Sequence, residues 1–350
     1  MSAFKESALT VPHWAKPAAP TLPAFNSLVQ MSPKRLLMPI AVYPGAELIG
    51  ITIREIVSDA EAQFLAIAAL HKRYQTRVVM SAMDLSVEAE AFGATVRSSE
   101  TEIPTVIGRL IPDLPTLKKL RQPLPGDGRT GVYLDAVRRL CQLPDKPLVL
   151  AGCIGPFSLA SRLAGVSEAL EMTLTEPDFM HRLLERSVAF LAEYLQAFQK
   201  AGAKGVIMAE PMAGLLSPEG LAEFSSAYIR PLGEAIAGGE FSIVLHNCGA
   251  QLQHLPAVLE TGLKSFHFGS PMNIRAALEE VPEDVVLCGN LDPSNVFVRS
   301  QPDSVRTRAV ELLHNTANFR NFVLSSGCDL PPGTPLANLD VFYSALGAVK

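Results

Sequence analysis

The chain has 350 residues, of which 48% are hydrophobic and 19% are charged, and its formal net charge is −5. This composition supports a large buried core and excludes a wholly disordered chain. The mildly acidic balance gives no reason to expect nucleic acid or an anionic membrane as a partner. No apolar run approaches the roughly 18 residues that a helix needs to span a bilayer.

Residues 1–34 begin with an Ala/Pro-rich stretch that lacks the continuous apolar core of a signal peptide. We therefore interpret 1–34 as an N-terminal arm, followed by one large domain over 35–350, and we expect a cytoplasmic protein. The five cysteines are sparse and odd in number, which is untypical of a disulfide framework. Thiols in a reducing compartment stay free for metal binding or catalysis.

Short apolar runs rich in β-branched residues recur along the chain. Strands that are buried on both faces have such continuous apolar runs, which is typical of a parallel sheet covered by helices. The runs predict eight strands, at 39–44, 77–84, 147–155, 205–211, 241–249, 264–270, 284–292 and 321–329.

The segments between these runs have helical periodicity. Residues 178–201 form a long amphipathic stretch that ends near Gly202, Ser217 precedes a proline as a helix N-cap, and 303–313 is a further helix. Eight strands that alternate with helices predict an α/β fold, a (β/α)₈ TIM barrel with an N-terminal extension. An open doubly wound sheet is the alternative.

Polar and thiol groups gather at the ends of the predicted strands, where barrel enzymes carry their active sites. The strand interiors stay apolar, so the pattern marks one end of the barrel as the candidate site. The residues concerned are Asp84, Glu210, His246, Cys248, His267, Asn290, Asp292 and Cys328.

His246 and Cys248 lie two residues apart at the end of one strand, so their side chains point to the same face. Zinc favours imidazole and thiolate ligands, and a catalytic zinc site keeps one position open. With Cys328 from the last strand, the pair supplies three such ligands. A lone buried cysteine is more often a small hydrophobic residue, so spacing alone leaves a packing role open.

The carboxylates at strand ends have several possible roles. Asp84 and Glu210 are candidates for a general base, a metal ligand or half of an ion pair, and Glu88 after Asp84 is compatible with a solvated helix start. His267 is a candidate fourth ligand, a substrate contact or a hydrogen-bonded core histidine.

Several segments together resemble the uroporphyrinogen decarboxylase superfamily from about residue 35 to the end. They are GPFSLA (155–160), LLSPEGLAEF (215–224), LHNCG (245–249), CGNLDP (288–293) and SSGCDLPPGTPLANL (325–339). The H-x-C motif followed by a late GC before a Pro-rich segment is similar to the zinc-dependent methylcobamide:thiol methyltransferase branch.

The resemblance implies Zn²⁺ held by His246, Cys248 and Cys328. It implies transfer of a methyl group from methylcobalamin, a corrinoid carried by a partner protein, to a small thiol such as coenzyme M, which leaves Co(I). The resemblance further implies that Glu210 takes up a proton or orients the thiol, and that Asp84 lines the acceptor pocket. Contacts to the cofactor are expected from His267, Asn290 and Asp292.

Two other functions stay open at this point. A decarboxylase of the same superfamily carries an arginine-rich segment that binds porphyrinogen carboxylates, whereas residues 38–50 (MPIAVYPGAELIG) contain no arginine. A decarboxylase-type lyase is therefore an alternative. A barrel that binds a corrinoid or a metal without turnover is another.

Overall fold

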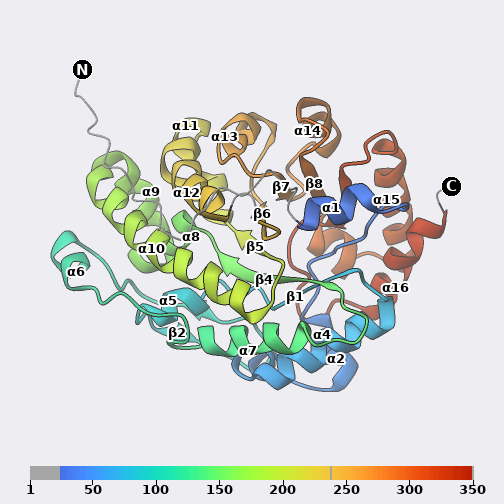
Figure 1. Cartoon of the computed structure of the whole chain (residues 1–350), viewed down its shortest axis with the longest axis horizontal. Helices are drawn as coiled ribbons and strands as arrows, with labels where there is room; N and C mark the ends of the chain where they lie inside the picture. The colour runs from blue at the N-terminus through green and yellow to red at the C-terminus, as the bar shows by residue number, and fades with distance from the viewer. Residues whose placement is uncertain (1–23, 237–238, 349–350) are drawn as a thin grey trace.

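The computed structural model describes residues 24–236 and 239–348. At its centre lies a curled, all-parallel sheet that is wrapped by helices (Figure 1). Within the described residues this sheet has seven strands, in the order β1-β4-β5-β6-β7-β8-β9. The strands are β1 (Val78–Met80), β4 (Leu148–Ile154), β5 (Gly205–Ala209), β6 (Ser242–Asn247), β7 (Ser265–Phe268), β8 (Val286–Leu291) and β9 (Phe322–Ser326).

The predicted α/β barrel-type fold is confirmed, since every strand of the central sheet is followed by at least one helical segment. The helices are α1 (Ala24–Met31), α2 (Pro44–Ile49), α3 (Ile53–Ser58), α4 (Ala60–Tyr74), α5 (Val87–Ala91), α6 (Leu114–Lys119), α7 (Thr130–Leu140), α8 (Pro156–Ala164), α9 (Val166–Thr175), α10 (Pro177–Ala201), α11 (Pro218–Leu221), α12 (Ala227–Ile236), α13 (Leu255–Leu259), α14 (Ile274–Glu280), α15 (Pro302–Asn315) and α16 (Leu336–Ser344). A short antiparallel pair, β2 (Val96–Arg97) and β3 (Thr105–Val106), was not expected from the sequence.

The predicted helices lie where the sequence patterns place them. The amphipathic stretch 178–201 lies in α10, which ends at Gly202 with a left-handed φ of 105°. Ser217 caps α11 by accepting a hydrogen bond from the backbone N–H of Gly220. Residues 303–313 lie within α15.

The prediction of a strand over 39–44 is wrong. Only Leu37 forms an isolated parallel bridge, to Leu324 of β9. After Met38, the next N–H that faces β9 is that of Ile40, and it donates to Ser326 Oγ instead of a backbone carbonyl (3.0 Å). Pro39 has no N–H to pair on the opposite side, and Pro44 begins α2, so no regular strand forms in this stretch. The segment nevertheless lies between the two edges of the sheet: Leu37 bridges to β9, and the Tyr43 hydroxyl reaches the carbonyl oxygen of Met83, three residues beyond β1, at 3.3 Å.

The part of the expected N-terminal arm that the structure describes is packed against the barrel. The backbone N–H of Phe25 in α1 donates to Ser242 Oγ at the start of β6 (3.0 Å), and Asn26 Nδ2 donates to the carbonyl oxygens of Lys264 and Asp284 (2.7 and 3.2 Å). Helix α1 therefore lies at the N-terminal ends of the strands. Residues 1–23 of the expected arm lie outside the described residues.

Substitution of Ile40 tests whether the irregular first segment, residues 37–43, contributes to the hydrophobic core. Its side chain is fully buried and its N–H donates to Ser326 Oγ at 3.0 Å. We expect Ile40→Ala to lower the free energy of unfolding by about 2–5 kcal/mol, because packing is lost and a cavity remains. Urea denaturation measures this, with Leu174→Ala (86% exposed) as a control that changes stability by less than about 0.5 kcal/mol. Equal stability of both variants would contradict this role.

Candidate metal centre

His246, Cys248 and Cys328 come together at the C-terminal ends of β6 and β9. Each offers one ligand atom, and these atoms all lie within 4.8 Å of one another. Cys328 Sγ lies 3.4 Å from His246 Nε2. Among the described residues this is the only group of three or more His, Cys, Asp or Glu side chains with such an arrangement.

Local structure explains why the two residues from β6 point the same way. His246 and Cys248 are separated by Asn247, whose side chain turns away and accepts the backbone N–H groups of Gly249 and Ala250 (3.1 and 3.0 Å). This turn holds the backbone directly after Cys248. Gly269 makes room for it, because a Cβ there would lie 2.1 Å from the carbonyl oxygen of Cys248.

The two thiols influence each other's protonation. A hydrogen bond from the Cys328 thiol lowers the pKa of Cys248 below its usual range; burial opposes this shift, and His246 adds to it. The same contact, together with burial, raises the pKa of Cys328. Of the two thiols, Cys248 is therefore the one that more readily becomes a thiolate.

This donor set fits zinc. Zinc binds cysteine sulfur at about 2.3 Å and imidazole nitrogen at about 2.0–2.1 Å, so tetrahedral ligand atoms lie roughly 3.5–3.8 Å apart. Cys328 Sγ and His246 Nε2 are 3.4 Å apart, and all three ligand atoms lie within 4.8 Å of one another. Three protein ligands also leave a fourth tetrahedral position for a water or a substrate, as in catalytic zinc sites.

His267 lies directly behind His246. Its Nδ1 is 2.8 Å from His246 Nδ1, its Nε2 is 2.8 Å from Ser325 Oγ, and its side chain is fully buried. Burial, followed by the charge of His246, lowers the pKa of His267 well below its usual range. Both ring nitrogens are thus engaged within the protein, and the contact of His267 with a cofactor stays a prediction.

Glu210 follows β5 and is 1% exposed. Its carboxylate accepts the backbone N–H groups of Phe157 and Ser158 at the start of α8 (2.8 Å each) and the hydroxyl of Ser225 (3.1 Å). Burial raises its pKa, while these hydrogen bonds, Ser158 first, act in the opposite direction. Gly155 leaves space for it, since a Cβ there would lie 2.5 Å from Glu210 Oε2.

Asp84 forms a buried ion pair. Its Oδ2 lies 2.5 Å from Arg129 Nη1, its side chain is 0% exposed, and its Oδ1 accepts the N–H and hydroxyl of Ser86 (2.9 and 2.6 Å). Arg129 also binds Glu90. The ion pair is one of the roles that the sequence left open for Asp84, and its contact with an acceptor stays a prediction.

Asn290 and Asp292 hold the loops at the ends of β7 and β8. Asn290 Nδ2 donates to the carbonyl oxygens of Gly269 and Met272 (2.9 and 2.7 Å). Asp292 accepts the backbone N–H of Asn295 (2.7 Å) at the start of the next helical turn. Their expected contacts with a cofactor stay predictions.

Two further carboxyl groups are buried. The interpretation of Glu88 as part of a solvated helix start is wrong, and Asp329 was not singled out in the sequence. Glu88 is 2% exposed; one oxygen accepts the N–H of Ile154 (3.0 Å), and the other is buried and has no hydrogen-bond partner among the described residues. Burial raises the pKa of Glu88 to about 7. Asp329, next to Cys328, has both carboxylate oxygens buried, and neither has a hydrogen-bond partner in the part of the chain that the structure describes; burial raises its pKa. The sequence carries no signal for either, because flanking acidic residues suggest a solvated helix start around Glu88.

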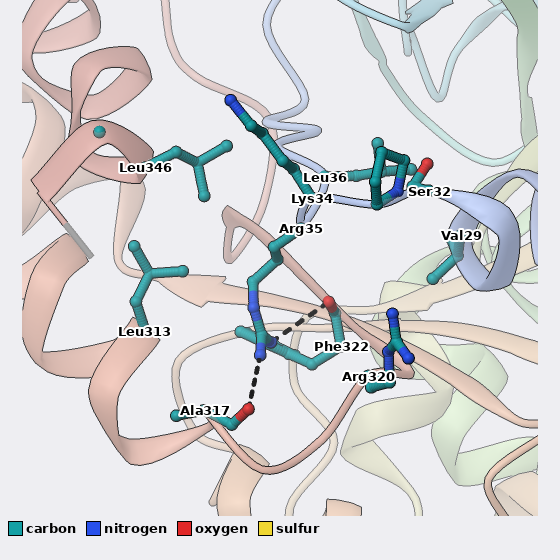
Figure 2. A pocket seen from close by; sticks show the side chains of 12 residues that line it. Val29, Ser32, Lys34, Arg35, Leu36, Leu313, Ala317, Arg320, Phe322 and Leu346 are labelled. Carbon is teal, nitrogen blue, oxygen red and sulfur yellow. Dashed lines mark hydrogen bonds between the residues drawn. The ribbon is translucent and has the colours of Figure 1, made fainter. Parts of the chain in front are cut away.

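A hollow of about 760 Å³ lies at the opposite end of β9 from Cys328 (Figure 2). Arg35 crosses it and donates to the carbonyl oxygens of Thr316 and Phe322 (2.8 and 3.4 Å), with its guanidinium over the Phe322 ring. The N-terminal face of a barrel generally serves stability. We interpret Arg35 as a structural residue that joins the first segment to the end of α15 by hydrogen bonds, and not as part of the metal centre.

The uroporphyrinogen decarboxylase family model matches residues 37–349. The chain belongs to this family. A methylcobamide:CoM methyltransferase, MtbA, of Methanosarcina acetivorans is 27% identical over 286 residues, which cover 81% of this chain and 83% of the relative. A uroporphyrinogen decarboxylase of Prochlorococcus marinus is 23% identical, covering 83% of this chain and 85% of the relative.

A solved structure of a methyltransferase from Methanosarcina mazei has the same fold, with a TM-score of 0.83 at 21% identity, covering 93% of this chain and 97% of that one. The predicted family and the predicted methyltransferase class of enzyme are confirmed by these findings. Among the described residues, no helix combines the length and apolarity that crossing a membrane requires.

The Asp84–Arg129 pair is expected to contribute to stability. Asp84→Asn leaves the Arg129 cation buried with less compensation, so we expect a loss of about 3–5 kcal/mol in the free energy of unfolding. Denaturant titration measures it. Asp135→Asn breaks an ion pair with Arg138 whose partners are more than half exposed, and should cost less than about 1 kcal/mol. Equal losses in both variants would contradict the assigned burial effect.

The raised pKa of Glu88 predicts that the free energy of unfolding depends on pH. Because its folded-state pKa of about 7 lies above its ordinary value of 4.5, the native state binds the extra proton between these values. Stability therefore falls as the pH rises through this window and levels off above it. The free energy of unfolding of the wild type minus that of Glu88→Gln should decrease between about pH 5 and 7. A difference that is constant with pH would rule this out.

Proposed function

We propose that the protein is a zinc-dependent methyltransferase that moves a methyl group from a methylated corrinoid partner protein to a small thiol such as coenzyme M. The observation that carries this proposal is the His246, Cys248 and Cys328 group at the strand ends. The relative named methylcobamide:CoM methyltransferase supports the same chemistry.

The three ligands suit that task. Zinc bound there would supply the Lewis acidity that keeps an acceptor thiol in its thiolate form. The two cysteine thiolates balance the two positive charges of the ion, and His246 adds a neutral donor. The fourth position would be open to the sulfur of the acceptor, and zinc held there would keep that sulfur ready to take up the methyl group that the corrinoid partner supplies.

Glu210 is proposed to receive or hold the proton that the acceptor thiol loses. Its carboxyl group is buried, and its raised pKa makes it a better proton acceptor than an exposed glutamate. Asp84 is proposed to line the acceptor pocket through its ion pair with Arg129. A cytoplasmic location belongs to this proposal, because reducing surroundings keep the thiols free.

Relatives named uroporphyrinogen decarboxylase make a lyase the second candidate. Such an enzyme needs cations for several carboxylates of its substrate. Residues 38–50 offer no arginine, and Met38, Ile40, Val42 and Tyr43 within that stretch are buried in the core. This arrangement favours the methyltransferase.

Zinc content and methyl transfer test the proposal together. Purified protein should contain about one zinc per chain and should methylate a thiol from methylcobalamin. Cys328→Ala, Cys248→Ala and His246→Ala should each weaken zinc binding by more than the roughly 10–100-fold that follows loss of an outer partner, and should abolish transfer while the barrel stays folded.

Cys141→Ala is the matched control, since Cys141 is another half-buried thiol but lies at the end of α7. It should keep zinc and activity. Full zinc occupancy and full activity in Cys328→Ala would overturn the proposal. Formation of coproporphyrinogen from uroporphyrinogen at enzyme-like rates would favour the lyase, and zinc binding without any turnover would favour a binding protein.

A further inference from the structure

A series of buried hydrogen bonds leads from His246 away from the metal centre. His246 Nδ1 meets His267 Nδ1 at 2.8 Å, and His267 Nε2 meets Ser325 Oγ at 2.8 Å. Ser325 Oγ in turn lies 2.5 Å from the carbonyl oxygen of Met38. The three side chains are at most 1% exposed. Water therefore does not compete for these hydrogen bonds.

The carbonyl oxygen of Met38, at the end of this series of hydrogen bonds, fixes the direction of each of them. A carbonyl oxygen can only accept, so the Ser325 hydroxyl must donate its single proton to Met38. The Ser325 oxygen is then an acceptor, and His267 Nε2 must carry the proton that it receives. In neutral His267 this leaves Nδ1 as an acceptor, so His246 Nδ1 must carry a proton.

The result for His246 is an unprotonated Nε2, the atom that faces Cys328. In the reverse order, two acceptor oxygens would face each other at 2.5 Å between Ser325 and Met38, and a proton would sit on His246 Nε2. A cation on His267 is unfavourable too, since its nitrogens meet an imidazole and a hydroxyl, neither of which neutralises a positive charge.

We propose that His267 and Ser325 are positioning residues that lock His246 in the tautomer whose Nε2 lone pair is free to bind zinc. The statement that this lone pair binds zinc rests on the proposed function. The tautomer of His246 does not, because it follows from the hydrogen bonds within the protein. Metal-bound histidines commonly donate their second N–H to an outer partner that fixes ring orientation. Here that partner is a neutral imidazole, so the charge balance of the ion is left to the two thiolates.

Three variants separate this role from simple packing. His267→Phe fills the space but removes the acceptor for His246, while His267→Asn keeps an oxygen near the position of Nδ1. Ser325→Ala removes the hydroxyl that sets the direction. The matched control is Ser265→Ala, a buried serine of β7 whose hydroxyl donates to Asn26 Oδ1 (2.7 Å) away from His267.

Zinc affinity, measured by competition with a chromophoric chelator, is the first readout. We expect His267→Phe and Ser325→Ala to weaken binding about 10–100-fold, and His267→Asn and Ser265→Ala to stay within a few-fold of the wild type. Wild-type affinity in both His267→Phe and Ser325→Ala would overturn the inference. If His267→Phe does not fold, Ser325→Ala decides, because it removes one oxygen only.

The second readout is the histidine tautomer in the metal-free protein, from ¹⁵N-labelled histidine and two-bond ¹H–¹⁵N correlation spectra. Signals are assigned by their loss in His246→Asn and His267→Asn. The wild type should show His246 protonated at Nδ1 and His267 at Nε2, and Ser325→Ala should mix the tautomers. His246 protonated at Nε2 in the wild type would overturn the inference. If the tautomers are as expected but the protein binds no zinc, the positioning role of His267 and Ser325 is supported and the proposed function is overturned.

Discussion

The site depends on the parallel register of β6, β7, β8 and β9. In this register His246 of β6 stands directly beside His267 of β7, and Asn290 of β8 stands beside Ser325 of β9. Because parallel strands all end at the same edge of the sheet, ligands and their hydrogen-bond partners meet there without long loops. Any shift of one residue in this register would turn His246 away from Cys328.

Glycines permit the close approach that this register demands. A Cβ on Gly269 would collide with the backbone of Cys248, and one on Gly327 would lie 2.9 Å from the backbone nitrogen of Ser270. The strand ends therefore come nearer to one another than residues with side chains would allow. This closeness holds both cysteines within reach of His246.

The protein stabilises its buried carboxylates in different ways. Asp84 has a cation and Glu210 has three hydrogen-bond donors, whereas Glu88 and Asp329 have oxygens that no other described residue contacts by a hydrogen bond. Burying an uncompensated charge is costly, so the last two are held closer to their neutral forms. The charged and neutral carboxyl groups around the site are thus set by their immediate neighbours, not by residue type.

The sequence by itself determined the features that follow from local periodicity. Seven of the eight predicted strands exist in the described residues, and His246 and Cys248 share a face, because the two-residue repeat of a strand is a property of the backbone. The H-x-C and GC motifs also marked Cys328 as the third member of the group.

Tertiary structure alone decided the partners of each group. Arg129 is 45 residues from Asp84, Ser325 is 58 residues from His267, and Glu88 is buried by segments far along the chain. The first segment has no regular strand beside β9 because Ile40 N–H and the Met38 carbonyl oxygen bond to the side chains of Ser326 and Ser325 instead of the β9 backbone, although its apolar pattern is that of a strand. Hydrogen-bond direction and burial arise from contacts between distant residues, and no local pattern encodes them.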